Sequence, residues 1–164
     1  MKAVGRGATT RTARIIAAAP EAIYAAFMDP VALADWLPPG EMTGKIHSFD
    51  ARPGGGYRMS LFYPPQEAAP HSGEPRGKTA AGEDMVSVRF LELSPPSRIV
   101  EAVTFHSDDP ALRGEMIITV TFDAVAGGTE VGFHFENLPP GLRPEDNEAG
   151  TRQSLEQLAR RFGA

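Results

Sequence analysis

The sequence predicts an α+β fold in which an antiparallel sheet of about seven strands is followed by one long C-terminal helix. Two observations carry this prediction. Strand-like segments alternate with Gly- and Pro-rich turns from Thr9 to Asn137, and residues 143–163 carry the signals of a helix start, an apolar stripe and a helix stop. Two short helices are expected directly after the first strand.

The N-terminal part of the chain supplies the first strand and the two short helices. Residues 1–8 are predicted to be a disordered lead, and residues 9–164 a single domain, because the chain length fits one typical domain. Residues 9–17 alternate as a strand does. Pro20 then opens a helix with Ile23 and Phe27 on its buried face, and Asp29 caps a second short helix over residues 31–37.

The middle of the chain reads as hairpins joined by tight turns, which favours an antiparallel meander. The strands are expected at residues 42–49, 57–63, 85–93, 99–105, 115–122 and 131–137. Residues 64–82 break this spacing. A segment of that length between strands is typical of a functional lid or of a disordered insertion, and both interpretations stay open.

The last two hairpins allow the register to be predicted from their turns. Pairing outward from each turn brings apolar residues together on one face of the sheet and polar residues on the other. The expected pairs are Phe90 with Glu101, Val88 with Val103, Val86 with Phe105, Phe122 with Val131, Val120 with Phe133 and Ile118 with Phe135, while Thr119 and His134 share the polar face.

The closing helix is predicted to be apolar at one end only. Leu155, Leu158, Ala159 and Phe162 form one stripe, so they should clamp the helix to the sheet. Its first half is polar and small, and we expect this half to face a cavity mouth or solvent; it comprises Asn147, Gly150, Thr151 and Ser154.

Composition excludes several classes of function. The net charge of −5 opposes a nucleic-acid surface, and the lack of cysteine excludes disulfides, thiol nucleophiles and thiolate metal sites. No apolar run approaches the ~18 residues of a membrane span, and the run ending at Pro20 is too short for a signal peptide. We therefore expect a cytoplasmic protein, without membrane insertion, that exists as a monomer or homodimer.

Glu101 is the candidate catalytic residue because it lies on the predicted apolar face. A buried carboxylate is either paired or has a raised pKa, and both conditions suit a general acid or base. The alternatives are a Glu at the rim of a strand, or a register slip that returns it to solvent. The possible ion-pair partners are Arg58, Arg89 and Arg98.

No metal or cofactor site is expected. The four histidines are His47, His71, His106 and His134, and no two have the spacing of helical metal ligands. The segment at residues 73–79 is close to a phosphate-binding loop, but it is one residue short and neither follows a clear strand nor opens a helix.

Several local phrases resemble bacterial proteins related to the C-terminal domain of the heat-shock-protein ATPase activator, within the helix-grip superfamily of START domains and polyketide cyclases. They are Trp36-Leu37-Pro38-Pro39, Tyr57-Arg58-Met59, the run from Arg89 to Val100, Phe105 to Pro110, Gly114-Glu115-Met116, Gly128-Thr129-Glu130-Val131 and Ser154 to Ala159. The resemblance covers about residues 9–162.

The resemblance implies a sheet curled around the C-terminal helix, with a cavity between them that binds small apolar molecules. It supplies no catalytic residue. An enzyme of the cyclase, dehydratase or hydrolase type and a stress-related chaperone-interaction module remain alternatives; the eukaryotic activator binds its chaperone through a separate N-terminal domain that this sequence does not show. The residues expected to line the cavity are Trp36, Tyr57, Met59, Leu61, Tyr63, Val88, Phe90, Val103, Phe105, Met116, Ile118, Phe133, Phe135, Thr151 and Leu155.

Overall fold

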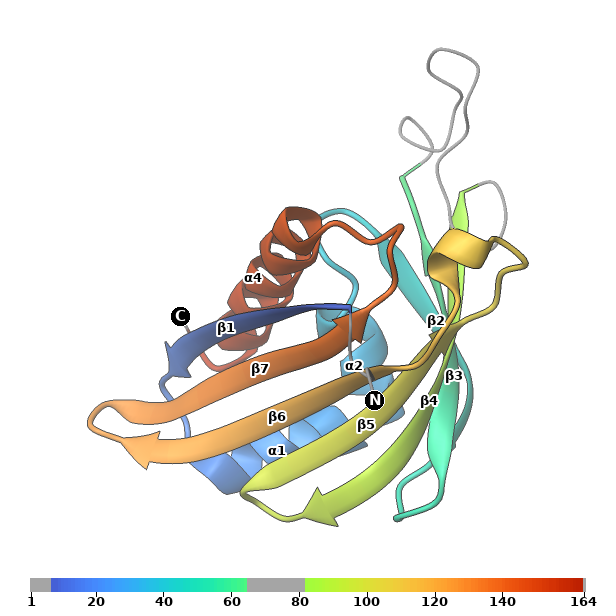
Figure 1. Ribbon diagram of the computed structural model, residues 1–164. Helices are drawn as coiled ribbons and strands as arrows, with labels where there is room; N and C mark the ends of the chain where they lie inside the picture. The colour runs from blue at the N-terminus through green and yellow to red at the C-terminus, as the bar shows by residue number, and fades with distance from the viewer. Residues whose placement is uncertain (1–6, 65–81, 164) are drawn as a thin grey trace.

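The computed structural model describes residues 7–64 and 82–163, which form one antiparallel sheet with helices packed on a single face (Figure 1). The strands are β1 (Ala8–Ile16), β2 (Thr43–Asp50), β3 (Gly56–Phe62), β4 (Glu83–Ser94), β5 (Arg98–Phe105), β6 (Met116–Val125) and β7 (Gly128–Leu138). The helices are α1 (Pro20–Met28), α2 (Pro30–Trp36) and α4 (Pro144–Arg161), with a 3-10 turn at Pro110–Leu112. The predicted helix-grip fold is confirmed.

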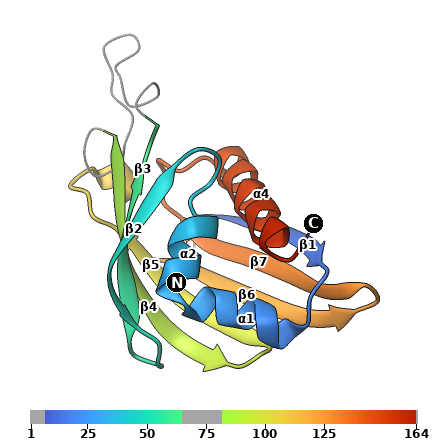
Figure 2. The ribbon, with the colours of Figure 1, turned by 180° about the vertical axis from the view of Figure 1, so that it is seen from behind.

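The seven strands lie in the order β1-β7-β6-β5-β4-β3-β2. From β2 to β7 each strand pairs with the next in sequence, as hairpin connections require. β1 and β2 therefore occupy opposite edges although they are neighbours in sequence, and α1 and α2 span the distance between them. Viewed from behind, α1, α2 and α4 all lie on the inner side of the curved sheet (Figure 2).

The register predicted for the last hairpins is confirmed. Glu101 pairs with Phe90 of β4, and Ile118 pairs with Phe135 of β7. Thr119 and His134 are also partners, on the outer face. Turn chemistry and the apolar pattern were enough here because a shift by one residue would expose every apolar side chain.

The N-terminal boundary differs slightly from the prediction. β1 begins at Ala8, and the backbone N–H of Gly7 donates to Asn137 Oδ1 at 3.3 Å. Gly7 and Ala8 thus belong to the sheet edge. Residues 1–6 of the predicted lead and residues 65–81 of the predicted lid lie outside the described residues.

The apolar stripe of α4 packs as predicted, chiefly against β1 and also against α2. Leu155, Leu158 and Ala159 are buried, and Phe162 is partly buried against the same core. The helix begins at Pro144, whose missing N–H costs nothing at a first helical position, and ends before Gly163, which has a φ of 93°.

Of the polar residues of α4 expected at a cavity mouth or in solvent, Asn147 and Gly150 are partly exposed, whereas Thr151 and Ser154 are buried. Thr151 and Ser154 are 7 and 5% exposed, so neither faces open solvent. The Ser154 hydroxyl donates to the Leu37 carbonyl at 2.6 Å, and that of Thr151 donates to the Asn147 carbonyl at 2.8 Å. Each hydroxyl can be buried because it donates a hydrogen bond to a backbone carbonyl. Hydrophobic periodicity does not reveal such hydrogen bonds.

A set of side chains on α4 fixes the helix to the end of α2. Gln157 Nε2 donates to the Trp36 and Pro38 carbonyls, each at 2.7 Å, beside the Ser154 bond to Leu37. One turn further, Arg161 pairs with Asp35 at 2.8 Å. We call Ser154, Gln157 and Arg161 the α4 latch; it satisfies the carbonyls that the end of a short helix leaves unpaired.

Candidate ligand-binding site

The candidate site lies on the inner face of the sheet, which is apolar apart from a few groups. Its side chains alternate with outward-facing ones along each strand, as strand geometry dictates. The buried inner residues of the five strands β3 to β7 include Tyr57, Met59, Asp84, Val86, Val88, Phe90, Ile99, Glu101, Val103, Met116, Ile118, Val120, Phe122, Thr129, Val131, Phe133 and Phe135.

One end of this interior is closed by α1 and α2. The ring centroid of Phe27 lies 4.7 Å from that of Trp36 and 5.1 Å from that of Phe122. Trp36 is 1% exposed, and its Nε1 donates to the Ala26 carbonyl at 2.9 Å. The structure therefore places Trp36, expected to line the cavity, in the packed contact between the two short helices.

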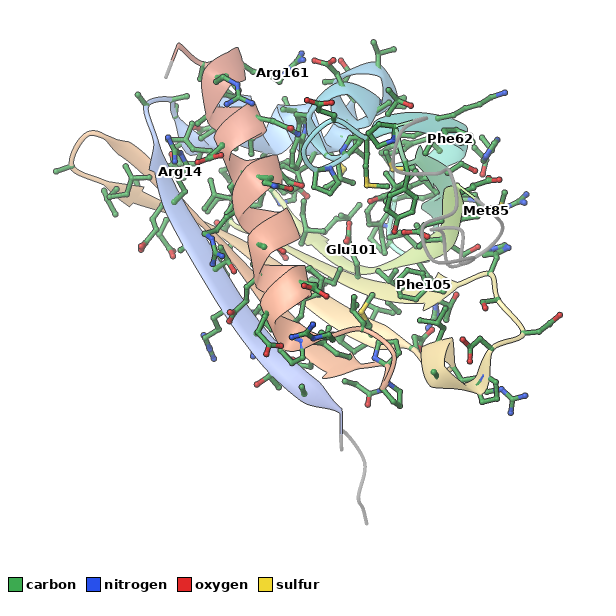
Figure 3. All side chains as sticks on the ribbon, turned by 90° about the horizontal axis from the view of Figure 1, so that it is seen from above. Arg14, Phe62, Met85, Glu101, Phe105 and Arg161 are labelled. Atoms are coloured by element: carbon green, nitrogen blue, oxygen red, sulfur yellow. The ribbon has the colours of Figure 1, made fainter. Side chains whose placement is uncertain are left out.

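The other end retains contact with solvent. Phe135, Ile118 and Glu101 form one row across three strands, with exposures of 9, 8 and 7%. The next inner residues toward the closed end, Val120 and Ile99, are 1 and 0% exposed. Seen from above, Glu101 and Phe105 lie between α4 and the far strands of the sheet (Figure 3). All three residues of the row are thus buried with only slight contact with solvent, and Phe133, beside Val120, is 7% exposed.

Glu101 is a buried carboxyl without a partner among the described residues, since no hydrogen bond or ion pair reaches it from them. The arginines considered as partners lie elsewhere: Arg89 pairs with Glu115 at 3.1 Å and Arg98 with Glu92 at 3.4 Å. Burial raises the pKa of Glu101 to about 7. In the described chain, the side-chain polar atom that is both fully covered and unpaired is Tyr24 Oη, so the carboxyl oxygens of Glu101 are not fully covered.

Tyr57 brings a second polar group to the same interior. Its ring stacks on Phe49 at 5.4 Å and lies 5.9 Å from the ring of Phe90, the cross-strand partner of Glu101. Burial raises the pKa of Tyr57 well above its usual value, and the negative charge of Glu101 raises it further. The Tyr57 hydroxyl is therefore a hydrogen-bond donor at every ordinary pH.

Asp84 is an inner residue that the sequence analysis missed. It is 4% exposed, and the Tyr63 hydroxyl donates to its Oδ2 at 2.9 Å. The signal was present, because Asp84 precedes Val86 by two residues and so shares its face. The predicted strand began at Met85, one residue too late to include Asp84.

The remaining predicted lining residues divide between the interior and its borders. Phe105 and Leu61 are partly exposed toward the open end, whereas Leu155 is 1% exposed within the core. The Thr151 hydroxyl is already bonded to the α4 backbone. Met59, Val88, Phe90, Val103, Met116, Ile118, Phe133 and Phe135 all lie on the inner face.

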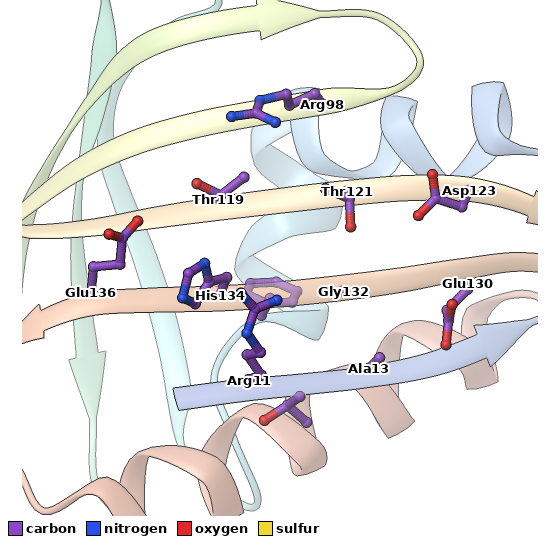
Figure 4. Close-up of a pocket in the computed structure, with 12 residues that line it drawn as sticks. Arg11, Ala13, Arg98, Thr119, Thr121, Asp123, Glu130, Gly132, His134 and Glu136 are labelled. Carbon is purple, nitrogen blue, oxygen red and sulfur yellow. The ribbon is translucent and has the colours of Figure 1, made fainter. Parts of the chain in front are cut away.

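A separate hollow of about 540 Å³ lies on the outer face of the sheet (Figure 4). Its lining includes Arg11, His134, Asp123 and Glu130, so charges of both signs meet open solvent there. A recess of this kind suits hydrated ions better than an apolar molecule. Within residues 7–64 and 82–163, no group of three or more His, Cys, Asp or Glu side chains could hold a metal ion.

The chain is similar to known proteins in both sequence and structure. The family model described as activator of Hsp90 ATPase homolog 1-like protein matches residues 17–163. A crystal structure from Chromobacterium violaceum is 36% identical, covers 95% of this chain and 97% of its own, and superposes with a TM-score of 0.78.

More distant structures share the fold alone. One from Rhodobacter sphaeroides is 20% identical over 95% of this chain and 93% of its own, with a TM-score of 0.72. DynU16, a protein of the dynemicin biosynthetic locus, is 17% identical; the match covers 93% of this chain and 46% of that one, with a TM-score of 0.63. No functionally curated protein matched the chain.

Proposed function

Because the chain belongs to the family of activator of Hsp90 ATPase homolog 1-like proteins, we propose that it binds a small hydrophobic molecule on the inner face of its sheet. The observation that supports this proposal is the apolar inner face with the buried, unpaired carboxyl of Glu101 among its residues, in a row whose exposures of 7 to 9% exceed those of Val120 and Ile99 behind it. A ligand entering at the Phe105 end would meet apolar side chains on several strands.

Burial of apolar surface would supply the affinity. A ligand that loses ~200 Å² of apolar surface gains ~5 kcal/mol at ~25 cal/mol per Å². Part of that gain is offset by the loss of translational and rotational freedom on binding. Millimolar or weaker affinity, roughly, is therefore the expectation for a simple hydrocarbon probe.

A fluorescence titration with 2-isopropenylnaphthalene tests the proposal. We expect saturable binding of one probe per chain. Ile118→Phe fills the open row and should weaken binding by ~10-fold or more, because it removes space that the probe needs. Thr119→Phe is the matched control, since Thr119 is the next residue on β6 and faces outward.

Two outcomes of this titration would contradict the proposal. If the wild-type protein does not bind the hydrocarbon, or if Ile118→Phe and Thr119→Phe bind it alike, the inner face is not the binding site. Circular dichroism of each variant checks that the fold is retained.

Glu101 supports a second candidate function, an enzyme of the cyclase, dehydratase or hydrolase type that acts on the bound molecule. A carboxyl with a pKa of about 7 can both accept and release a proton near neutral pH. Once a substrate is found, Glu101→Gln should abolish turnover and retain binding; unchanged turnover would remove Glu101 from this role.

The other expectations from the sequence stay predictions. They are a cytoplasmic location, a monomeric or homodimeric state, and contact with a chaperone. In the described part of the chain, no helix is long and apolar enough to cross a bilayer.

A further inference from the structure

We propose that the ligand of the inner face carries a neutral hydrogen-bond acceptor, such as a ketone or ester carbonyl, which Glu101 in its protonated form and Tyr57 hold together. This inference rests on the proposed function and names the chemistry of its ligand. Among the described residues, no hydrogen bond or ion pair reaches the carboxyl of Glu101 or the hydroxyl of Tyr57.

Glu101 and Tyr57 share the inner face of the sheet, two strands apart. Glu101 is on β5 and Tyr57 on β3, with β4 between them. On β4, Phe90 pairs with Glu101 and lies in ring contact with Tyr57, while Val88 pairs with Tyr57 itself. Glu101 and Tyr57 are thus diagonal neighbours across Phe90 and Val88, near enough for the charge of Glu101 to raise the pKa of Tyr57.

Glu101 is the less usual of the two because it is more than nine-tenths buried and unpaired among the described residues. The buried polar side chains of the described chain include no Lys, Arg or His. A carboxyl in such surroundings retains its proton at mildly acid pH, and a protonated carboxyl is a donor.

The groups that face Glu101 from each neighbouring element favour the neutral form. Tyr57 is the titratable group on β3, and it remains protonated. Asp84, the other buried carboxyl, lies on β4 six residues from Phe90, the cross-strand partner of Glu101. The other inner residues on the neighbouring strands and on α4 do not titrate; they are Val88, Phe90, Met116, Ile118, Phe133, Phe135, Thr151 and Leu155.

Two neutral donors on an apolar floor select an acceptor. A phenol and a carboxylic acid can both donate to the lone pairs of one carbonyl oxygen, as donors do in an oxyanion hole. A hydrocarbon would instead cover these donors without satisfying them. A cationic ligand would require Glu101 to lose its proton, so its binding would have the opposite dependence on pH.

Matched probes distinguish these chemistries. The ketone 2-acetylnaphthalene and the alkene 2-isopropenylnaphthalene have the same shape and differ only in having a carbonyl oxygen or a methylene group. At about pH 5.5 we expect the wild-type protein to bind the ketone ~10-fold more tightly, the effect of one good hydrogen bond. At about pH 8.5, where Glu101 is ionised, the ratio should fall several-fold, to the smaller preference that the Tyr57 hydroxyl alone sustains.

Variants then assign the preference to each residue. Glu101→Gln keeps a donor that does not titrate, so it should prefer the ketone equally at both pH values. Tyr57→Phe should reduce the preference several-fold. Tyr24→Phe is the control, because the Tyr24 hydroxyl is also buried and unpaired but lies against Phe122 at the closed end.

Two results would overturn the inference and leave the proposed function standing. One is equal binding of ketone and alkene by the wild-type protein at both pH values. The other is tighter binding of 1-(2-naphthyl)ethylamine than of the ketone, increasing from about pH 5.5 to 8.5, which would indicate a cationic ligand. Failure of every probe to bind would instead reject the proposed function itself.

Discussion

Glu101 has a chemical environment that ordinary packing does not explain. It lies among apolar side chains, has no counter-ion in the described chain, and still retains partial contact with solvent. Burial without a partner is costly for a carboxylate and much less costly for a carboxylic acid. The protonation state of this one residue therefore couples stability, ligand preference and pH.

The first prediction at this scale concerns stability against pH. The pKa of Glu101 is raised from 4.5 to about 7 in the folded protein, so between these pH values the folded state binds more protons than the unfolded state. Its contribution to stability is then present at low pH and is lost as pH rises. We expect this residue to lower the free energy of unfolding by about 2 to 3 kcal/mol between about pH 5 and 8.

Urea denaturation of wild type and Glu101→Gln measures this contribution. The variant should lose less stability than the wild type over the same range, because glutamine does not ionise. Glu136→Gln, on the outward face of β7, should follow the wild type. Parallel curves for wild type and Glu101→Gln would show that Glu101 is not held in its neutral form.

Sequence reasoning reached Glu101 but not its surroundings. Alternation and hairpin register were enough to place it opposite Phe90, because both signals are local. The approach of Tyr57 from two strands away, and the inward position of Asp84, depend on how far the strands extend. Strand ends are the least determined part of a sequence pattern.

At the scale of elements, the α4 latch decides how the closing helix is held. Gln157 donates to two carbonyls at the end of α2, so Gln157→Ala would leave both without this donor. We expect a loss of about 1 to 3 kcal/mol in the free energy of unfolding, measured by urea denaturation. Glu156→Ala, an exposed change one residue earlier, should cost less than ~0.5 kcal/mol. Equal costs would mean that the apolar stripe alone fixes α4.

The turn between β6 and β7 offers a matched pair of glycines. A Cβ on Gly128 would clash with the carbonyl oxygen of Ile16, whereas a Cβ on Gly127 would meet no atom within 4 Å. Gly127→Ala should therefore cost only the backbone strain at its positive φ, ~1 kcal/mol. Gly128→Ala should lower the free energy of unfolding clearly more, because its Cβ would push β7 away from the end of β1 at Ile16.

Thermal unfolding of the two variants checks this expectation. A lower melting temperature for Gly128→Ala than for Gly127→Ala is the predicted order. The reverse order would contradict the close approach of Gly128 to Ile16 at the edge of the sheet.

For the whole molecule, the sequence determined the architecture better than the site. Hairpin spacing, the two proline-initiated helices and the closing stripe each report local structure, and together they leave few ways to connect the sheet. On the polar face of α4, the burial of Thr151 and Ser154 was missed because their hydroxyls are buried through bonds to carbonyls. Whether the interior is filled or open depends on the side-chain volumes of several helices and strands together. The hydrophobic pattern of a single segment does not contain that information.

The proposed function depends on an interior that is filled at one end and admits a ligand at the other. α1 and α2 fill one end with aromatic rings, while the row of Phe135, Ile118 and Glu101 keeps its exposure. A molecule bound there should contact inner residues of β6 and leave its outer residues untouched.

Nuclear magnetic resonance of the complex with 2-isopropenylnaphthalene tests this directly, through intermolecular Overhauser effects to methyl groups of β6. We predict contacts from the probe to the methyl groups of Met116 and Ile118, which face inward, increasing to saturation as probe is added. Contacts confined to Thr119 and Thr121, which face outward on the same strand, would place the probe on the wrong side of the sheet and contradict binding in the interior.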